Sequence, residues 1–374
     1  MDKPLVILVG GFLGAGKTTL LAKATERLVA KGRCVGLITN DQAPNLVDTL
    51  VLQERSKDRN AAVREVSGGC FCCLFDDLVG SMDRLLNDCR PDILIGEPVG
   101  SCTDLSATVA QPIKAIHTDR YRLAPLTVLV DPDRVRFLVD PPPSPADRNT
   151  FPENVLYIYV KQLEEADVIA VNKADLLSPE RQAAIENALR RQFPQARVLS
   201  ISAKEGTGLD AWLDLVTGDD DAGRTIAEVD YDIYAEGEAA LGWLNASYQL
   251  RANHETDWRS FCEKMMATFR EEFLRRQAEI AHLKIHLGTN EKNLVGNLTT
   301  TFGEPSWRGE ADDSVSIATL VINARVHIGP APLQAVVDQG VLEIAGDEIQ
   351  VLTEALQCFS PSRPVPVHRF AGVV

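Results

Sequence analysis

A segment close to the start of the chain carries residue types that bind phosphate. Gly11, Gly14 and Gly16 precede Lys17 and Thr18, and the segment matches the pattern G-x-x-x-x-G-K-[ST] in full. Glycines let successive backbone N–H groups turn toward phosphate oxygens, and the lysine adds a charge between the outer phosphates. The alternative is a chance glycine-rich turn before a helix. We expect a nucleoside triphosphate here, with the Thr18 hydroxyl on Mg²⁺, bound by Gly11, Gly14, Ala15, Gly16, Lys17, Thr18 and Thr19.

A second group of residues favours guanine as the base. Asn172-Lys173-Ala174-Asp175 follows the apolar run DVIAV, where a loop can meet a base beyond the carboxyl end of a parallel strand. A carboxylate such as that of Asp175 can accept hydrogen bonds from N1–H and the 2-amino group of guanine, and adenine lacks both donors. The tripeptide Ser202-Ala203-Lys204 after the next apolar run supplies a second loop beside the base. GTP is therefore favoured over ATP, and the alternative is an ordinary strand-to-helix turn.

Two acidic residues follow predicted strands and could handle magnesium or water. Glu97, in Gly96-Glu97-Pro98-Val99-Gly100, could hold the hydration shell of Mg²⁺, and the Gly100 N–H could sense the γ-phosphate. Asp41 could orient the attacking water instead. The sequence leaves open which acid positions that water, and either one could also be a solvated loop acid or a helix cap.

The segment Gly68-Gly69-Cys70-Phe71-Cys72-Cys73 places three soft ligands within four residues. Cys70, Cys72 and Cys73 could converge on one thiophilic cation, with zinc, cobalt and copper(I) as candidates. We expect an extended segment, in which residues separated by one position point to the same side. A carboxylate, water or imidazole could complete a tetrahedron. The alternative is a buried or redox-sensing cluster.

The remaining cysteines and three of the histidines carry weaker signals. We expect scattered single cysteines to behave as small core side chains, namely Cys34, Cys89, Cys102, Cys262 and Cys358. His282 and His286 are four residues apart on a predicted strand, and His327 could lie on a neighbouring one. A second metal site there is an alternative to ordinary sheet histidines, which we take as the default.

Length and composition limit the classes of protein to consider. The chain has 374 residues, enough for two or three domains, and no run approaches the roughly 18 apolar residues of a membrane span. Its 53 acidic and 38 basic residues give a net charge of −15, which disfavours nucleic acids and anionic membranes as partners. The start of the chain does not resemble a secretion signal, and clustered thiols suggest a reducing compartment, so we predict a cytoplasmic protein.

The elements that must position these residues alternate between strands and helices. Apolar runs typical of buried parallel strands occur at 5–9, 35–39, 92–96, 126–130, 167–171 and 198–201. Helices are predicted at 17–30, at 179–193 with Ser178 as N-cap, and at 208–216. The proline-rich stretch 140–152 is predicted to be a surface loop. We therefore predict an α/β fold of the P-loop NTPase class with a mostly parallel sheet.

The pattern of apolar and charged residues changes after the acidic segment 218–223. A charged helix around 257–278 and alternating strands at AHLKIHL and SIATLVINARVHI indicate a smaller α+β domain, and a β-α-β-β(-β)-α order would fit a ferredoxin-like sandwich. The predicted organisation is a nucleotide domain at 1–218, a linker at 219–240 and a C-terminal α+β domain at 241–374.

Four motifs occur in the order and spacing of the CobW-type GTPases, relatives of the urease and hydrogenase nickel-insertion GTPases. Over about 5–216 the sequence resembles that family in GGFLGAGKTT, GGCFCC, GEPVG and NKAD. The segment Thr39-Asn40-Asp41-Gln42 looks more like the urease-accessory version of the first switch. The resemblance implies a slow GTPase with GTP or GDP and Mg²⁺ as ligands, and with zinc or cobalt at Cys70, Cys72 and Cys73.

The leading hypothesis is a GTP-driven metal chaperone that delivers its ion to a client metalloprotein or assists maturation of a cofactor-dependent enzyme. In this view Lys17, Asp41 and Glu97 take part in hydrolysis, and a homodimer would be compatible. A GTPase switch for enzyme assembly without metal delivery is the alternative. A small-molecule P-loop kinase is a third hypothesis, which the guanine-selecting loops disfavour.

Overall fold

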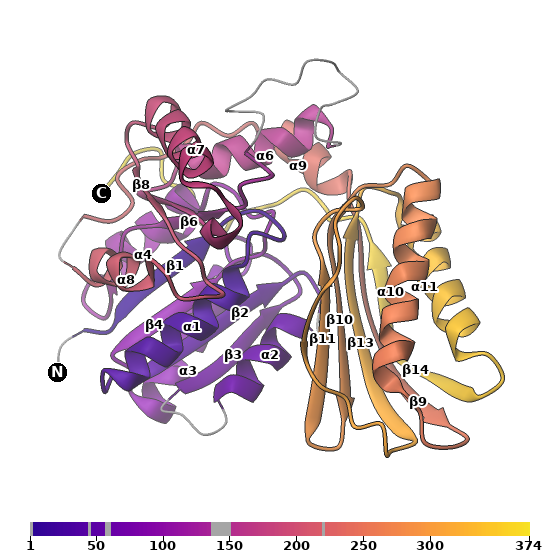
Figure 1. Cartoon of the computed structure of the whole chain (residues 1–374). Helices are drawn as coiled ribbons and strands as arrows, with labels where there is room; N and C mark the ends of the chain where they lie inside the picture. The colour runs from indigo at the N-terminus through magenta and orange to yellow at the C-terminus, as the bar shows by residue number, and fades with distance from the viewer. Residues whose placement is uncertain (1–2, 44–45, 57–60, 136–150, 219–220) are drawn as a thin grey trace. The chain divides into compact units, whose positions relative to one another are not determined.

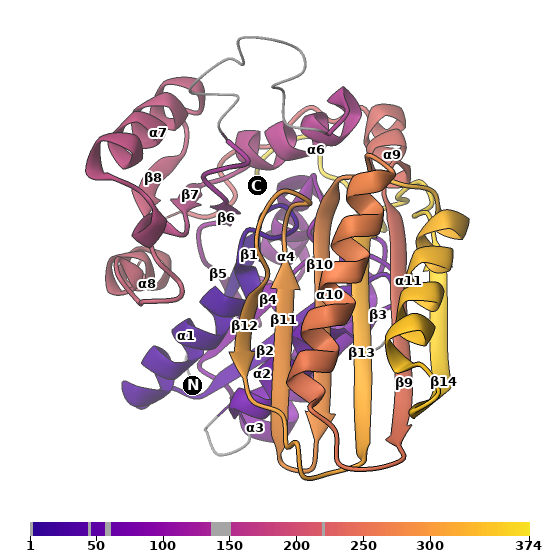
Figure 2. The same cartoon turned by 45° about the vertical axis from the view of Figure 1, so that its right-hand side comes forward.

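The chain forms two compact units. The computed structural model describes residues 3–43, 46–56, 61–135, 151–218 and 221–374. The first unit comprises Met1–Gln42, Val51–Tyr234 and Arg363–Val374, and the second comprises Ala43–Leu50 and Ala235–Ser362. Figures 1 and 2 show that each unit contains its own sheet with helices packed on it.

The first unit is built on a parallel sheet with the strand order β3-β2-β4-β1-β6-β7-β8, and β5 pairs with β1. Every strand pair in this sheet is parallel. The strands are β1 (Leu5–Gly10), β2 (Val35–Asp41), β3 (Ala61–Ser67), β4 (Ile93–Glu97), β5 (Arg122–Leu123), β6 (Thr127–Val130), β7 (Val168–Val171) and β8 (Arg197–Ser200). The predicted α/β fold with a mostly parallel sheet is confirmed.

The helices of this unit connect successive strands, as parallel pairing requires. They are α1 (Lys17–Ala30), α3 (Phe75–Cys89), a π-helical turn (Ser106–Ala110) leading into α4 (Gln111–Ile116), α6 (Glu153–Glu164), a 3₁₀ turn (Ala174–Leu176), α7 (Pro179–Gln192) and α8 (Leu209–Thr217). α2 (Val47–Ser56) and α9 (Tyr231–Ala239) each cross the boundary between the units. Ser178 caps α7 as predicted, because its hydroxyl oxygen accepts a hydrogen bond from the Arg181 N–H.

The strands are apolar because helices cover the sheet. All six residues of β1 are buried, and α1 and α8 contribute Leu20, Leu21, Leu28 and Trp212 to the same hydrophobic core. The indole N–H of Trp212 donates to the Thr127 hydroxyl at 3.1 Å, which satisfies the polar atom of a fully buried side chain.

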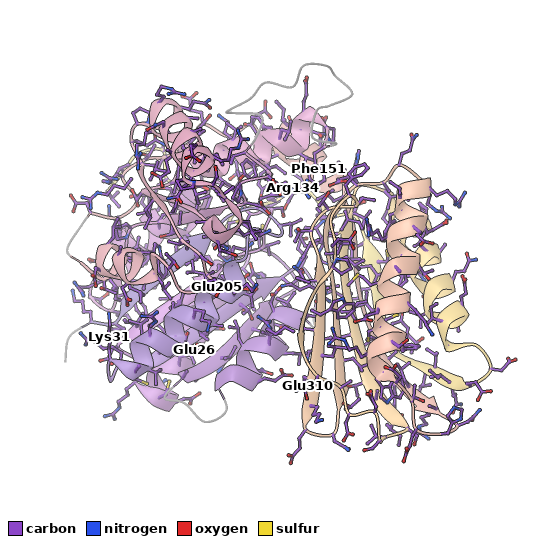
Figure 3. All side chains as sticks on the ribbon, viewed as in Figure 1. Glu26, Lys31, Arg134, Phe151, Glu205 and Glu310 are labelled. Atoms are coloured by element: carbon purple, nitrogen blue, oxygen red, sulfur yellow. The ribbon has the colours of Figure 1, made fainter. Side chains whose placement is uncertain are left out.

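An aromatic cluster supports the loop after β1. The ring of Phe12 meets those of Phe151 and Tyr159 edge-on, with centroids 5.8 and 5.7 Å apart. The Arg134 guanidinium lies 4.6 Å from the centroid of Phe151, and Figure 3 labels this pair. The loop that follows β1 therefore rests on rings from α6 and from the chain preceding it.

The second unit is an antiparallel sheet with the order β12-β11-β10-β13-β9-β14. Figure 2 shows both helices of this unit on the same face of the sheet. Its elements are β9 (Gly242–Ala252), α10 (Trp258–Arg275), β10 (Ile280–Thr289), β11 (Lys292–Leu298), β12 (Ser306–Gly309), β13 (Ile317–Val326), α11 (Pro330–Ala345) and β14 (Ile349–Phe359). Without β11 and β12, this is the β-α-β-β-α-β order of a ferredoxin-like fold.

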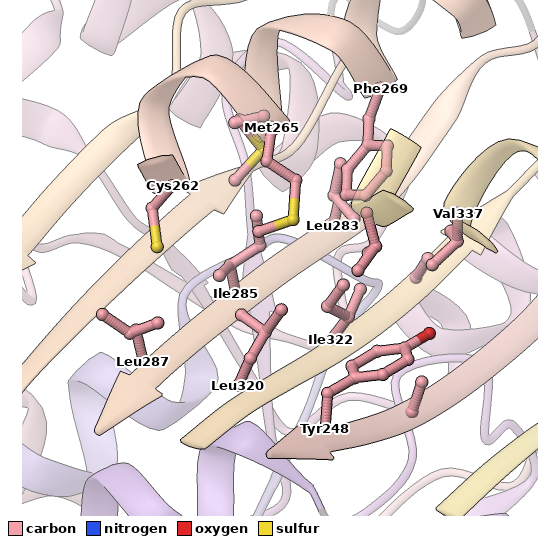
Figure 4. Packing of buried hydrophobic residues seen from close by; sticks show 14 of the residues in the cluster. Tyr248, Cys262, Met265, Phe269, Leu283, Ile285, Leu287, Leu320, Ile322 and Val337 are labelled. Carbon is pink, nitrogen blue, oxygen red and sulfur yellow. The ribbon is translucent and has the colours of Figure 1, made fainter. Parts of the chain in front are cut away.

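The core of the second unit lies between that sheet and its two helices. Met265 and Phe269 of α10 pack on Ile285 and Ile322, and Figure 4 shows these side chains filling the space. Cys262 is fully buried in the same cluster, so its prediction as a core residue is confirmed. Burial raises its thiol pKa to about 12.

The opposite face of that sheet is more polar and contacts residues 43–50. The Val47 N–H donates to Asn323 Oδ1 at 2.7 Å, Asn245 Nδ2 donates to the Ala43 carbonyl at 3.3 Å, and Lys284 forms an ion pair with Asp48. Because these bonds hold residues 43–50 to the second sheet, the segment belongs to that unit even though it directly follows β2.

The bounds of the units differ from the ranges expected from the sequence. Residues 43–50 lie in the second unit and residues 363–374 lie in the first, while the sequence ranges were 241–374 for the C-terminal domain and 1–218 for the nucleotide domain. Most of the predicted loop 140–152 and part of the acidic segment 218–223 lie outside the described residues. Among the described residues, no helix combines the length and apolar character of a membrane span.

Candidate functional site

The loop between β1 and α1 has a backbone that only glycines adopt without strain. Gly11, Gly14 and Gly16 have φ angles of 125°, 79° and 96°. A Cβ atom on Gly11 would lie 2.3 Å from the Leu129 carbonyl oxygen. The three predicted glycines therefore shape this loop, and larger residues would clash with the neighbouring strand or strain the chain.

Lys17 folds back over the same loop. It is the first residue of α1, and its ammonium donates to the carbonyls of Gly11 at 2.8 Å and Phe12 at 3.4 Å. The lysine is only 7% exposed. The N-terminal end of a 14-residue helix and a buried cation thus meet at one loop, which is the arrangement that attracts a polyanion.

Asn172 ties this loop to both segments predicted to surround the base. Its Nδ2 donates to the Ala15 carbonyl at 2.8 Å, and its Oδ1 accepts from the Ala203 N–H at 2.9 Å. A Cβ on Gly16 would lie 2.4 Å from that same Nδ2. The loops 11–18, 172–175 and 202–204 therefore form one connected group at the carboxyl ends of β1, β7 and β8.

The two loops predicted to surround the base, 172–175 and 202–204, contain both hydrogen-bonded and exposed side chains. Lys173 has a left-handed backbone, with φ 57°, and its ammonium pairs with Asp131 at 2.5 Å. Ser202 is buried, and its hydroxyl oxygen accepts from the Glu205 N–H at 3.0 Å. Asp175 and Lys204 are exposed at the surface. Asp131 is missing from the sequence prediction, although an acid directly after the apolar run LTVLV is a usable signal.

Thr18 and Glu97 meet beside the phosphate loop. The Thr18 hydroxyl donates to Glu97 Oε1 at 3.1 Å, and both side chains are buried. Hard oxygen ligands of this kind fit Mg²⁺. Gly100 lies against the same loop, because a Cβ there would be 3.1 Å from the Leu13 backbone nitrogen. Asp41 is buried at the end of β2, and its backbone carbonyl accepts from the Gly68 N–H at 3.1 Å.

Asn40 organises the cysteine segment, and the sequence prediction missed it. Its Nδ2 donates to the carbonyls of Val66 at 2.9 Å and Gly69 at 2.7 Å, while its Oδ1 accepts from the Phe71 N–H at 2.9 Å. Asn40 is itself buried. One side chain at the end of β2 therefore fixes the loop that carries the thiols.

The three predicted thiols converge. The Sγ–Sγ distances are 2.8 Å between Cys70 and Cys72, 3.2 Å between Cys70 and Cys73, and 3.8 Å between Cys72 and Cys73. The expectation of an extended segment is wrong. The Cys70 carbonyl accepts from the N–H groups of Cys73 and Leu74, so a tight turn before α3 brings the sulfurs together.

A fourth thiol contacts this cluster. Cys102, expected to be an ordinary core residue, is buried, and its side chain is hydrogen-bonded to those of Cys70 and Cys72. Hydrogen bonds from Cys102, Cys72 and Cys73 hold the pKa of Cys70 well below its usual range. Hydrogen bonds with Cys102, Cys70 and Cys73 raise the pKa of Cys72 well above its usual range, and the bond with Cys70 raises the pKa of Cys73 to about 11. Within the loop, Cys70 therefore loses its proton more readily than Cys72 or Cys73.

The last residues of the chain run along the cysteine cluster. The Val365 N–H donates to Cys73 Sγ at 3.3 Å, and the Val367 N–H donates to the Cys72 carbonyl at 2.9 Å. Arg369 forms an ion pair with the fully buried Asp104 at 2.7 Å. This segment, residues 363–374, was assigned from the sequence to the C-terminal domain, and we call it the tail.

The histidines that suggested a second metal site are not grouped with other ligands. His282 Nε2 is 3.1 Å from Asn297 Oδ1, and burial lowers the pKa of His327. Over the described ranges, the only set of three cysteine, histidine or acidic side chains within 4.8 Å of one another is Cys70, Cys72 and Cys73.

The model of one protein family, "CobW/HypB/UreG, nucleotide-binding domain", matches residues 5–200. The chain belongs to the CobW/HypB/UreG family. Its phosphate loop, cysteine segment and NKAD loop all lie within the matched range, so the resemblance drawn from these motifs is confirmed. The tail and the whole second sheet lie outside that range.

This chain spans about half of the length of the curated relatives that it matches. The "Zinc-regulated GTPase metalloprotein activator 1" of Dictyostelium discoideum is 27% identical over 221 residues, 53% of this chain and 46% of that protein. The "Zinc chaperone CobW" of Sinorhizobium sp is 30% identical over 215 residues, 53% of this chain and 58% of that protein. Among solved structures, the zinc-bound YjiA GTPase of E. coli shares 17% identity, with a TM-score of 0.34 over 90% of this chain and 98% of that one.

We predict that the tail limits access to Cys73. The double variant Val365→Pro/Val367→Pro lacks the two N–H groups that bond to the cysteine segment. Alkylation of Cys73 in the metal-free protein, followed site by site with mass spectrometry, should become several-fold faster. Val365→Ala/Val367→Ala keeps both N–H groups and is the matched control, and Cys34 is the internal reference. An unchanged Cys73 rate in the proline variant would show that these bonds do not hold the tail in place.

We also predict that zinc binding tightens as pH rises. The thiols of Cys72 and Cys73 have raised pKa values, so both are protonated at neutral pH and must each release a proton to bind metal. Each released proton contributes about tenfold per pH unit, so the protons of Cys72 and Cys73 should make affinity rise at least about a hundredfold per unit between pH 6.5 and 8. Competition with a chromophoric chelator measures this slope. A flat profile would contradict thiol ligation, and Cys72→Ser should lower the slope by about one proton.

Proposed function

We propose that this protein binds and hydrolyses GTP and carries a thiophilic divalent metal, zinc or cobalt, to a client protein in the cytoplasm. One observation carries the proposal. Loops at the carboxyl ends of the same parallel sheet bear both a phosphate loop and a cluster of converging thiols. Adjacent residues of β2, Asn40 and Asp41, hydrogen-bond to the cysteine loop. The names of the zinc-associated relatives agree with it.

Binding of the triphosphate would use the loop 11–18. The buried Lys17 would exchange its bonds to the loop carbonyls for phosphate oxygens, and the N–H groups of α1 would face the same anion. Mg²⁺ would bind at Thr18, with Glu97 holding its hydration shell. Asp175 would select guanine, and Asn172 would keep the base-side loops in register with the phosphate loop.

Hydrolysis needs a group that orients water against the γ-phosphate, and we assign this role to Asp41 or Glu97. Both are buried at the ends of adjacent strands, since β2 pairs with β4 and Thr39 lies opposite Glu97. Lys17 would neutralise charge on the phosphates as the bond breaks. The Gly100 N–H would donate a hydrogen bond to the γ-phosphate. Loss of that bond on hydrolysis would let the segment that follows β4 change position.

The metal would be cargo held by thiolates. A tetrahedral zinc–thiolate site with bonds of about 2.3 Å requires sulfurs roughly 3.8 Å apart. The Cys72–Cys73 separation of 3.8 Å meets this requirement, while Cys70 would move outward from its neighbours by about 0.6 to 1 Å. The client protein and a homodimeric assembly both stay predictions, since no residue is assigned to either.

The two sites would be coupled through the end of β2. Asn40 makes two hydrogen bonds to the cysteine loop and one to Val66 of β3, and the next residue, Asp41, is a candidate to face the reacting water. A shift of Asp41 on nucleotide exchange would therefore strain or release the loop that holds Cys70, Cys72 and Cys73. By thermodynamic reciprocity the metal must alter nucleotide affinity by the same factor.

We predict that zinc affinity depends on the bound nucleotide. The dissociation constant for zinc, measured with a non-hydrolysable GTP analogue, with GDP and without nucleotide, should differ by about 5- to 150-fold between states. Cys72→Ser should weaken zinc binding and abolish zinc-dependent changes in GTP turnover while leaving GTP-analogue binding intact. Cys89→Ser, a half-buried thiol on α3, is the matched control. One zinc constant in all three states would exclude a coupled chaperone and leave the assembly-switch hypothesis.

We predict that Asp175 determines the choice of base. Asp175→Asn replaces one acceptor by a donor, so guanine N1–H and the 2-amino group are no longer both satisfied, and GTP affinity should fall by at least about a hundredfold. Xanthosine triphosphate, which has a carbonyl in place of the 2-amino group, should bind this variant better than GTP. Asp214→Asn removes an exposed carboxylate on α8 and should change neither affinity. Equal GTP affinities for wild type and Asp175→Asn would remove this residue from the site.

A further inference from the structure

Cys102 is set apart from the other single cysteines by its place in the fold. It lies five residues after Glu97, on the chain segment that leaves β4, and it is 1% exposed. Its side chain is hydrogen-bonded to those of Cys70 and Cys72. A sulfur from a second part of the chain therefore touches a cluster that otherwise comes entirely from one loop.

The backbone around Cys102 is fixed by its own set of hydrogen bonds. The Cys102 N–H donates to the Val99 carbonyl at 2.8 Å. Gln162 Nε2, from α6, donates to the carbonyls of both Gly100 and Cys102, at 3.0 and 2.9 Å. These bonds fix the backbone of Cys102 through residues outside the cysteine loop.

We propose that Cys102 is the fourth thiolate ligand of the metal carried by Cys70, Cys72 and Cys73, and that it is the ligand whose position the nucleotide controls. The proposal rests on the proposed function, because it concerns the same metal. Three cysteines leave one position of a tetrahedral zinc or cobalt ion open. Among the side chains that contact the cluster, Cys102 is a thiol from outside the loop and is already in contact with two of the three ligands.

The same segment contacts the phosphate loop at its other end. Glu97 accepts the hydrogen bond from Thr18, and Gly100 approaches the backbone of Leu13 so closely that a side chain would not fit. Residues 97–102 thus run from the expected Mg²⁺ position to the sulfur cluster. A change at the γ-phosphate that moves this segment would add or withdraw one thiolate, and a metal that loses one of four ligands is easier to hand over.

The alternative for a fourth ligand is His368 of the tail, which is half-buried. Its ring packs edge-on against Phe75, with centroids 5.2 Å apart. Neither His368 nor Cys102 belongs to the group of three ligand atoms that lie within 4.8 Å of one another in the described chain, so contact with the cluster decides between them. Since Cys102 is buried at the cluster and bonded to two of its sulfurs, we assign the position to Cys102.

The test counts sulfur ligands in the full-length protein. Zinc K-edge X-ray absorption of the loaded, nucleotide-free protein should show four sulfurs, and Cys102→Ser should show three sulfurs with one lighter ligand. With Co²⁺ as probe, the thiolate charge-transfer band should weaken by about a quarter, in proportion to the thiolates lost. Cys89→Ser should leave the count at four. Three sulfurs in wild type, or the same count in Cys102→Ser and wild type, would overturn the assignment. His368→Ala should not change the count, and a loss of one lighter ligand there would favour the histidine.

The control by nucleotide is tested on the same samples. The ratio of zinc dissociation constants between the GTP-analogue and GDP states should shrink at least about tenfold in Cys102→Ser relative to wild type. An undiminished ratio in the variant would overturn the role of Cys102 as the controlled ligand while leaving the coupled chaperone intact. A wild-type ratio of one would instead refute the proposed function. In zinc-free protein, unchanged GTP-analogue binding and an unchanged melting temperature with GDP would show that the variant is folded.

Discussion

The hydrogen bonds of two buried asparagine side chains hold the loops of the first unit in place. Asn172 connects the phosphate loop to the loop at 202–204, and Asn40 connects the end of β2 to the cysteine segment. A carboxamide has both a donor and an acceptor but no charge. It can therefore join two backbone segments without competing with phosphate, magnesium or a soft metal for the charged partners. A carboxylate at either position would lack the donor, and an ammonium group would lack the acceptor.

The sequence was sufficient for the parts of the site that depend on local patterns. The phosphate loop was predictable because glycines with positive φ, a lysine and a helix start follow one another directly in the chain. The three loop cysteines were predictable for the same reason, since four residues cannot separate their sulfurs far. The strands β1, β2, β4, β6 and β7 were found because burial on both faces leaves uninterrupted apolar runs, and β8 was found from its short apolar run although it is only partly buried.

The parts that were missed depend on contacts between distant residues. Cys102 looks like any single cysteine until β4 and the cysteine loop are placed beside each other. Asn40 looks like a turn residue, and its bonds to Val66 and Phe71 exist only once β2 pairs with β3. The strand β3 (AAVREVS) is only partly buried and carries two charged residues, so it lacks the apolar run that identified its neighbours. The tail has no periodic pattern at all, and only its hydrogen bonds show where it belongs.

The segment after β4 is held by polar bonds as well as by buried apolar side chains such as Val99 and Leu105. Gln162 and Glu165 of the α6 region bind its backbone at Gly100, Cys102 and Ser106, and the Tyr234 hydroxyl accepts from the Thr103 N–H at 3.2 Å. Such bonds can be exchanged for others at a net difference of about 1 kcal/mol each. Asp104 adds a further constraint, since its buried carboxylate binds both Tyr231 and Arg369 of the tail. A shift of residues 97–104 would therefore also move the tail, which runs along Cys72 and Cys73. In this proposal one short segment changes both the set of metal ligands and the position of the tail beside them.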